Sequence, residues 1–206
     1  MTRSARWLAA VAVLTATLTL PGTAQTPKSS AATETAIFAA GCFWCVEEAF
    51  DKVAGVVSTT SGYTAGRTRD PSYEDVSSGG TGHTEALQVV YDPGKVSYEA
   101  LLATFWRNVD AVDGGGQFCD RGSQYRSGIY VRTPEQRRLA ETSRTAVAAQ
   151  LGKPIATEIV AASEFYQAEG YHQDYYTKNP VRYKFYKWNC GRAQRLAELW
   201  GTSSGR

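Results

Sequence analysis

Strand-like and helix-like patterns alternate irregularly after residue 34, and this order limits the folds open to the chain. Buried or alternating apolar runs predict strands over residues 35–40, 56–63, 85–91, 127–132 and 155–161. Apolar residues at helical spacing predict helices over residues 43–53, 97–108 and 134–152, while the aromatic-rich remainder shows little period before residues 192–200. This order favours an α+β two-layer sandwich over a doubly wound sheet. We expect a mixed sheet with flanking helices and a long irregular C-terminal segment.

The boundaries of the helix over residues 134–152 are the best marked in the chain. Thr133 is a typical N-cap residue, Pro134 suits the first helical position, and Gln136 can complete a capping box. Gly152 ends the pattern, as glycine commonly does at a helix C-terminus. The sequence therefore predicts both ends of this helix.

The first 34 residues have a different composition from the rest. Two arginines precede an apolar run over residues 7–20, and small residues follow up to Ala24. That layout predicts a secretory signal peptide over residues 1–24, because the run is shorter than the roughly 20 residues needed to span a bilayer. Residues 25–34 are expected to form a flexible linker and residues 35–206 a single catalytic domain. We therefore expect a periplasmic or secreted protein, cleaved after Ala24, with no stable membrane anchor.

The charge balance excludes one class of partner. The chain has 22 Lys and Arg against 20 Asp and Glu, a formal net charge of +2. So small an excess gives no electrostatic footprint for nucleic acid. Since 43% of the residues are hydrophobic, the chain can instead form one domain with a sizeable core.

Cys42 follows a predicted strand and a glycine, at the expected start of a helix. Free N–H groups and the helix dipole favour a thiolate there, so we expect its pKa to be lowered and the sulfur to be nucleophilic. Cys45 completes a Cys-x-x-Cys pair on one helical turn. A four-cysteine zinc site is disfavoured, because Cys119 and Cys190 do not form a second such pair.

Several ordered segments resemble those of peptide methionine sulfoxide reductases of the A type. The resemblance covers residues 35–190 and begins with Gly41-Cys42-Phe43-Trp44. The further matching segments are Ser61 to Gly66, Pro71 to Tyr73, Gly82 to Glu85, Tyr91 to Pro93, Asp120 to Ser127, Glu169 to Gln173 and Lys178 to Pro180. So many matches in order are far more specific than any one of them.

The resemblance implies a reaction as well as a fold with some likeness to a ferredoxin-like plait. Cys42 would attack the sulfur of methionine S-sulfoxide, free or in a protein, leaving a sulfenic acid on Cys42. Glu85 matches the family's acid and would protonate the oxygen. The implied enzyme is a peptide-methionine (S)-S-oxide reductase, and repair of oxidised exported proteins is its expected role.

The resemblance also implies the substrate-binding residues. Tyr73 and Tyr125 match family tyrosines whose hydroxyls bind the sulfoxide oxygen. Asp120 matches a family aspartate that helps to position groups at the active site. Phe43 and Trp44 match the pocket for the substrate methyl. No cofactor and no metal is expected. Both histidines, His83 and His172, are expected to be structural hydrogen-bonding residues.

Turnover needs a second thiol that converts the sulfenic acid to a disulfide, and three cysteines compete for that role. Cys190 resembles a resolving cysteine on a mobile tail and is preferred. Cys45 replaces the glycine usual in the family's first motif, and Cys119 precedes Asp120. The disulfide would be reduced by a thioredoxin-like dithiol partner, and the protein is expected to act as a monomer.

Two other functions are compatible with parts of the sequence. A general thiol-disulfide oxidoreductase would use Cys42 and Cys45 alone, which leaves the segments around Glu85 and Tyr125 unexplained. A binding module lined by aromatic residues would bind its ligand even with every thiol alkylated. The reductase accounts for more of the chain than either.

Overall fold

The computed structural model describes residues 32–201. The predicted signal peptide and most of the predicted linker lie outside these residues. Strand β1 (Glu34–Ala40) begins at the last residue of the expected linker, because Glu34 pairs with Tyr91 of a neighbouring strand. Within the described residues, no helix combines the length and hydropathy needed to cross a bilayer.

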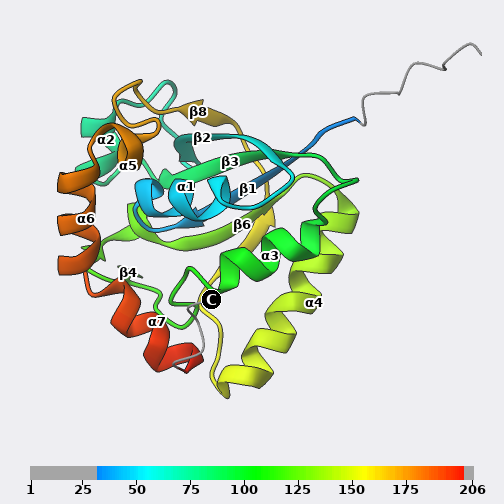
Figure 1. Ribbon diagram of the computed structural model, residues 1–206. Helices are drawn as coiled ribbons and strands as arrows, with labels where there is room; N and C mark the ends of the chain where they lie inside the picture. Colours follow the sequence, from blue (N-terminus) through cyan, green and yellow to red (C-terminus); the bar gives the residue numbers. More distant parts are fainter. Residues whose placement is uncertain (1–31, 202–206) are drawn as a thin grey trace, which may run out of the picture. The chain divides into compact units, whose positions relative to one another are not determined.

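The described chain is built around a mixed six-stranded sheet with the order β7-β6-β1-β3-β2-β8 (Figure 1). Its other strands are β2 (Val56–Thr64), β3 (Thr84–Tyr91), β6 (Ser127–Val131), β7 (Glu158–Ala161) and β8 (Phe165–Gln167). Neighbouring strands are antiparallel except β6 and β7, which are parallel. The central strands β1, β3 and β6 are largely buried, as expected from their apolar runs.

One face of the sheet carries the main core. Helices α1 (Phe43–Asp51), α3 (Tyr98–Trp106) and α4 (Pro134–Leu151) pack on this face (Figure 1). Phe38 of β1 lies at the centre, with its ring 5.0 Å from that of Phe50 and 5.3 Å from that of Phe105. A smaller cluster covers the other face around Ile37 and Tyr130. The expected two-layer α+β class is therefore confirmed.

Both ends of α4 lie where the sequence predicted them, but the Gln136 side chain bonds to different partners from those expected. The Thr133 hydroxyl accepts the Gln136 N–H at 3.1 Å, and Gly152 adopts the left-handed conformation. The Gln136 side chain accepts the Arg132 N–H and donates to the Thr35 carbonyl, both at 2.9 Å. It thus ties the helix start to β1 instead of completing a capping box.

The C-terminal segment contains more regular structure than we expected. It forms α5 (Tyr175–Lys178), α6 (Pro180–Asn189) and α7 (Arg192–Trp200), where only the range of α7 had shown a periodic pattern. The inner face of α6 is held by polar contacts, since Glu48 of α1 accepts hydrogen bonds from Tyr183 and Lys187. A test based on apolar spacing therefore misses this helix.

The loop regions also contain short elements that we did not predict. Helix α2 (Tyr73–Ser77) lies in the loop after β2, where Ser72 and Asp75 form a capping box. The glycine-containing loop after α3 forms a small hairpin of β4 (Gly116–Gln117) and β5 (Asp120–Arg121), followed by a 3-10 turn over Ser123–Tyr125. These elements present their residues toward the start of α1.

Removing the central ring of the core gives the first prediction. Phe38→Ala should lower the free energy of unfolding by about 3–5 kcal/mol, because Phe38 is fully buried and its loss leaves a cavity. Chemical denaturation measures this change. Val57→Ala, at a side chain that is 60% exposed, is the matched control and should change stability by no more than about 0.5 kcal/mol. Equal losses in the two variants would contradict the assignment of this core.

Candidate active site

A hollow of about 270 Å³ lies where β1 passes into α1. Its lining residues are Cys42, Phe43, Trp44, Tyr73, Glu85, Asp120, Tyr125 and Tyr186. The structure thus brings together seven residues that were predicted from the sequence, from five separate segments of the chain. Tyr186 was missed. The one sequence feature that could have indicated Tyr186 is its spacing from Tyr183 and Cys190, which places the three residues on one face of α6.

The turn at Gly41 fixes the position of Cys42. Gly41 has φ +77°, and a Cβ at this position would lie 2.5 Å from the Cβ of Gln117. Only glycine suits both the backbone conformation and the close approach of the hairpin. Cys42 is then the N-cap residue of α1, as its carbonyl accepts N–H groups of Cys45 and Val46.

The Cys42 thiol does not behave as the sequence alone suggested. Burial raises its pKa well above the usual value, and contact with Cys45 and the charge of Glu85 act in the same direction. The side chain is 5% exposed and makes no capping hydrogen bond to α1. Loss of hydration therefore outweighs the helix dipole, and the expectation of a lowered pKa is wrong.

Cys45 carries the ionised sulfur of the pair. It is buried with Cys42 and Tyr183 in one cluster. Hydrogen bonding to Cys42 lowers the Cys45 pKa to about 6, against the effect of burial and with help from the charge of Arg192. The hydrogen bond between the two sulfurs thus raises the pKa of Cys42 and lowers that of Cys45.

Glu85 reaches the hollow from β3 and is 3% exposed. Its Oε2 accepts the Phe43 N–H, one of the free donors of the first turn of α1, at 3.0 Å. Burial raises the pKa of Glu85 to about 8, and this hydrogen bond only partly opposes the shift. At neutral pH the side chain is therefore mostly a carboxylic acid, able to donate a proton.

Three tyrosines bring hydroxyl groups to the hollow. Tyr73 begins α2, Tyr125 ends the 3-10 turn and Tyr186 lies on α6. Burial raises the pKa of Tyr73 to about 12 and those of Tyr125 and Tyr186 further. All three stay protonated over the physiological range and can serve as neutral hydrogen-bond donors.

Phe43 and Trp44 form the apolar side of the site. The Trp44 ring stacks on Tyr175 with centroids 3.8 Å apart, and its Nε1 donates to Nδ1 of His172 at 3.1 Å. Both histidines are hydrogen-bonded, as expected: Nδ1 of His83 accepts the Gly66 N–H at 3.2 Å. His172 thus orients the indole ring beside Cys42.

The other two cysteines form a disulfide at the edge of the site. Cys119, at the turn of the β4–β5 hairpin, is joined to Cys190 at the end of α6, with their Cα atoms 4.9 Å apart. Asp120 connects this bridge to the hollow, because its Oδ2 accepts the Tyr186 hydroxyl at 2.5 Å. Two of the three candidate resolving cysteines are thus paired with each other, while Cys45 lies beside Cys42.

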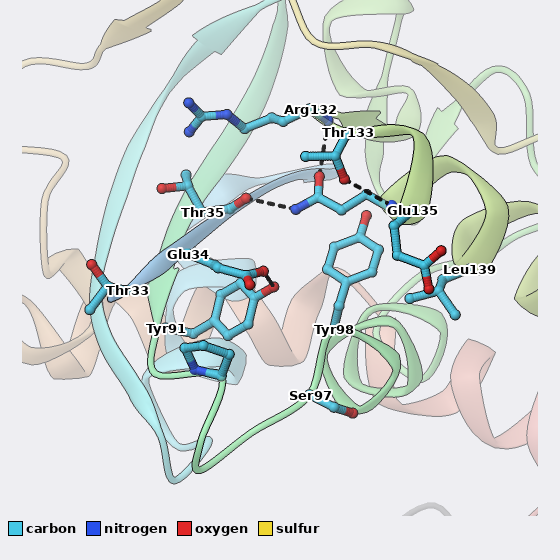
Figure 2. Close-up of a pocket in the computed structure, with 12 residues that line it drawn as sticks. Thr33, Glu34, Thr35, Tyr91, Ser97, Tyr98, Arg132, Thr133, Glu135 and Leu139 are labelled. Carbon is cyan, nitrogen blue, oxygen red and sulfur yellow. Dashed lines mark hydrogen bonds between the residues drawn. The ribbon is translucent and has the colours of Figure 1, made fainter. Parts of the chain in front are cut away.

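A larger hollow of about 650 Å³ lies elsewhere, between the start of β1 and the start of α4 (Figure 2). Its polar side chains largely bind one another: Tyr91 donates to Glu34 at 2.6 Å, and Gln136 bridges Thr35 and Arg132. Neither a cysteine nor a histidine is among its lining residues. The chemistry is therefore placed at the smaller hollow.

Comparison with known proteins agrees with the geometry of this hollow. The family model "Peptide methionine sulfoxide reductase" matches residues 34–204. The chain belongs to this family. It is 46% identical over 192 residues to "Peptide methionine sulfoxide reductase MsrA 2" of Caulobacter vibrioides, covering 93% of this chain and 97% of the relative.

Solved structures of the family share the fold. Methionine sulfoxide reductase A of Corynebacterium diphtheriae is 36% identical with a TM-score of 0.66, covering 75% of this chain and 77% of that chain. Mxr1 from Saccharomyces cerevisiae in reduced form is 33% identical with a TM-score of 0.69, covering 72% and 86%. The resemblance to the family that the sequence motifs indicated is confirmed.

The protonation of Glu85 gives a second prediction. The carboxyl should titrate with a midpoint near pH 8, so that its protonated C=O band is present at pH 6 and largely lost at pH 10. Difference infrared spectroscopy of the wild type against Glu85→Gln measures this band. A control is Glu141→Gln, at an exposed position of α4, which should leave the band unchanged. A Glu85 carboxyl already ionised at pH 6 would contradict the effect of burial.

Proposed function

We propose that this protein reduces methionine S-sulfoxide, free or in proteins, to methionine. One observation carries the proposal: the Cys42 sulfur, the Glu85 acid and three tyrosine hydroxyls line a single hollow with an aromatic wall. A sulfoxide needs a nucleophile for its sulfur, a proton for its oxygen and an apolar surface for its methyl group. The chain provides all three in one place.

The chemical step follows from these positions. The Cys42 sulfur bonds to the sulfoxide sulfur and gives up its proton, for which the neighbouring Cys45 thiolate is a ready acceptor. Glu85 protonates the sulfoxide oxygen as the S–O bond breaks. The hydroxyl then passes to the Cys42 sulfur as the bond between the two sulfurs breaks, so methionine leaves and Cys42 becomes a sulfenic acid. The substrate sulfur gains two electrons and the Cys42 sulfur loses two.

The surrounding side chains hold the substrate for this step. Tyr73 and Tyr125 donate hydrogen bonds to the sulfoxide oxygen, where negative charge develops. The Phe43 and Trp44 rings receive the methyl group. Asp120 accepts the Tyr186 hydroxyl and so fixes the third tyrosine in the hollow.

The positions of the cysteines support a relay to the protein surface. The Cys45 thiol is nearest to Cys42 and attacks the sulfenic acid, forming a Cys42–Cys45 disulfide and water. The Cys190 thiolate then attacks this disulfide, and Cys119 displaces the mixed disulfide to form Cys119–Cys190. Cys42 and Cys45 leave as thiols. Direct attack by Cys190 on the sulfenic acid is the shorter alternative.

A dithiol protein of the thioredoxin type is the proposed reductant. Cys119 is exposed, so a partner's thiolate can reach the terminal disulfide, whereas Cys42 and Cys45 are both at most 5% exposed. This burial also disfavours a general thiol-disulfide oxidoreductase working through Cys42 and Cys45, because protein disulfides are too bulky to enter. Export and cleavage after Ala24, supported by the composition of residues 1–24, would make oxidised exported proteins the substrates.

Replacing the nucleophile tests the activity. Cys42→Ser should abolish reduction of methionine S-sulfoxide, since a hydroxyl cannot replace the sulfur in this step. Release of methionine with a chemical dithiol measures the loss. The control is Cys119→Ser, which keeps the nucleophile and should retain a full first turnover. An active Cys42→Ser variant, or ligand binding as the only activity of the wild type, would refute the proposal.

Replacing Cys190 tests the relay. Cys190→Ser should still release one equivalent of methionine per protein in a single turnover but lose cycling driven by thioredoxin. Rapid-quench measurement of the first turnover and steady-state oxidation of the dithiol protein separate the two steps. Cys45→Ser distinguishes the routes, because its Cys119–Cys190 disulfide should form slowly if Cys45 attacks first. Undiminished cycling by Cys190→Ser would rule out the terminal pair.

A further inference from the structure

Three potential metal ligands meet at the edge of the active site. The sulfur atoms of Cys119 and Cys190 and a carboxylate oxygen of Asp120 all lie within 4.8 Å of one another. They come from the β4–β5 hairpin and the end of α6, which are 70 residues apart in the chain. Two thiolates and a carboxylate are a donor set that suits a zinc-like cation.

The distances match those in a site of this kind. Asp120 Oδ1 lies 3.8 Å from the Cys119 sulfur, and Oδ2 lies 3.9 Å from the Cys190 sulfur. Ligands around tetrahedral Zn²⁺ are separated by about 3.5–3.8 Å, given Zn–S and Zn–O bonds of about 2.3 and 2.0–2.2 Å. Two thiols freed from a disulfide move apart to about the 3.5–4.0 Å of a non-bonded contact. Rotation of the Cys119 and Cys190 side chains alone therefore makes room for a cation between the two sulfurs and Asp120.

Neighbouring groups already hold the donors in place. The Cys119 N–H donates to the Cys190 sulfur at 3.2 Å, which stabilises a thiolate there. The Tyr186 hydroxyl fixes Oδ2 of Asp120 at 2.5 Å, leaving Oδ1 free to bind. Such outer contacts orient the ligands of metal sites and fix their geometry.

The site is also open to an entering ion. The Cys119 side chain is exposed, and Cys190 lines a surface hollow of about 310 Å³ together with Asp110, Asp113 and Glu198. All three carboxylates are paired with an arginine, Asp113 with Arg121 and both Asp110 and Glu198 with Arg195, so three negative charges face two positive ones. Water can fill the fourth position.

We propose that reduction of the Cys119–Cys190 disulfide creates a binding site for one thiophilic divalent cation such as Zn²⁺. Its ligands are Cys119, Cys190 and Asp120. The dithiol reductant supplies two electrons and two protons to the disulfide, and the cation then displaces the two thiol protons. This site differs from the four-cysteine arrangement that the sequence spacing argues against. It exists only in the reduced protein.

Binding has a consequence for catalysis that rests on the proposed function. The cation withholds both thiols of the terminal pair from the relay, so cycling stops. It also engages Oδ1 of Asp120, whose Oδ2 accepts the Tyr186 hydroxyl within the substrate hollow. The cation should therefore inhibit turnover even though it binds outside the hollow.

Cobalt substitution tests the binding without any measurement of activity. Co²⁺ added to the reduced full chain under anaerobic conditions should give a thiolate charge-transfer band with one equivalent per protein, and Zn²⁺ should displace it. The disulfide form should give no band. Cys119→Ser and Cys190→Ser should each abolish it, and Asp120→Asn should weaken binding by at least about tenfold.

Matched controls separate this site from others. Asp113→Asn, in the neighbouring hollow, and the double variant Cys42→Ser with Cys45→Ser should both retain the cobalt band. Circular dichroism checks that every variant is folded. A band that persists in Cys119→Ser or disappears in the double variant would place the ion at the buried pair and overturn the proposal. Unchanged affinity in Asp120→Asn would remove the carboxylate from the site and overturn the three-ligand assignment.

The link to catalysis has a separate measurement. Zn²⁺ should inhibit thioredoxin-driven cycling of the wild type by at least about tenfold at saturation, and excess chelator should restore it. Metal binding without inhibition would overturn only the consequence for catalysis. Absence of methionine sulfoxide reduction in metal-free protein would count against the proposed function, while the cobalt titration would still decide the site.

Discussion

A single buried hydrogen bond connects the fold of this protein to its chemistry. The Phe43 N–H, at the start of α1, donates to the Glu85 carboxyl on β3. The N-cap side chain, Cys42, makes no capping hydrogen bond to the helix, so its sulfur is not used to satisfy the backbone. A residue from a distant strand therefore takes over a capping role. The proposed nucleophile, the proposed acid and the first turn of the helix are positioned together.

Burial explains how four cysteines acquire different tasks. Cys42 and Cys45 are both enclosed by aromatic rings of the C-terminal helices, and burial raises the pKa of Cys42, whereas the hydrogen bond to Cys42 lowers the pKa of Cys45. Cys119 and Cys190 lie at the edge, where the hairpin meets the end of α6. In the proposed relay, the inner pair acts on a small substrate side chain and the outer pair on a dithiol protein. Asp120 lies between the two environments and contacts both.

The sequence alone predicted five of the six strands of the sheet, because the central ones are buried and glycine or proline marks their ends, but it missed the short, more exposed β8. It predicted seven of the residues lining the hollow through their motifs, but not Tyr186, because the helix that carries it packs through tyrosine and lysine. The pKa of Cys42 was assigned the wrong direction, since the helix dipole can be inferred from sequence and the depth of burial cannot. Disulfide pairing was likewise left open, because only the tertiary structure brings Cys119 and Cys190 together.

The size of the substrate hollow limits which methionines this protein can reach. At about 270 Å³ and enclosed by rings on several sides, it has room for one side chain and not for the surface that surrounds it. A methionine packed in the core of another protein must first leave that core. Oxidation itself favours this, because a sulfoxide is polar and disrupts apolar packing. The damaged residues most often presented to the enzyme are thus those whose oxidation has already loosened their surroundings.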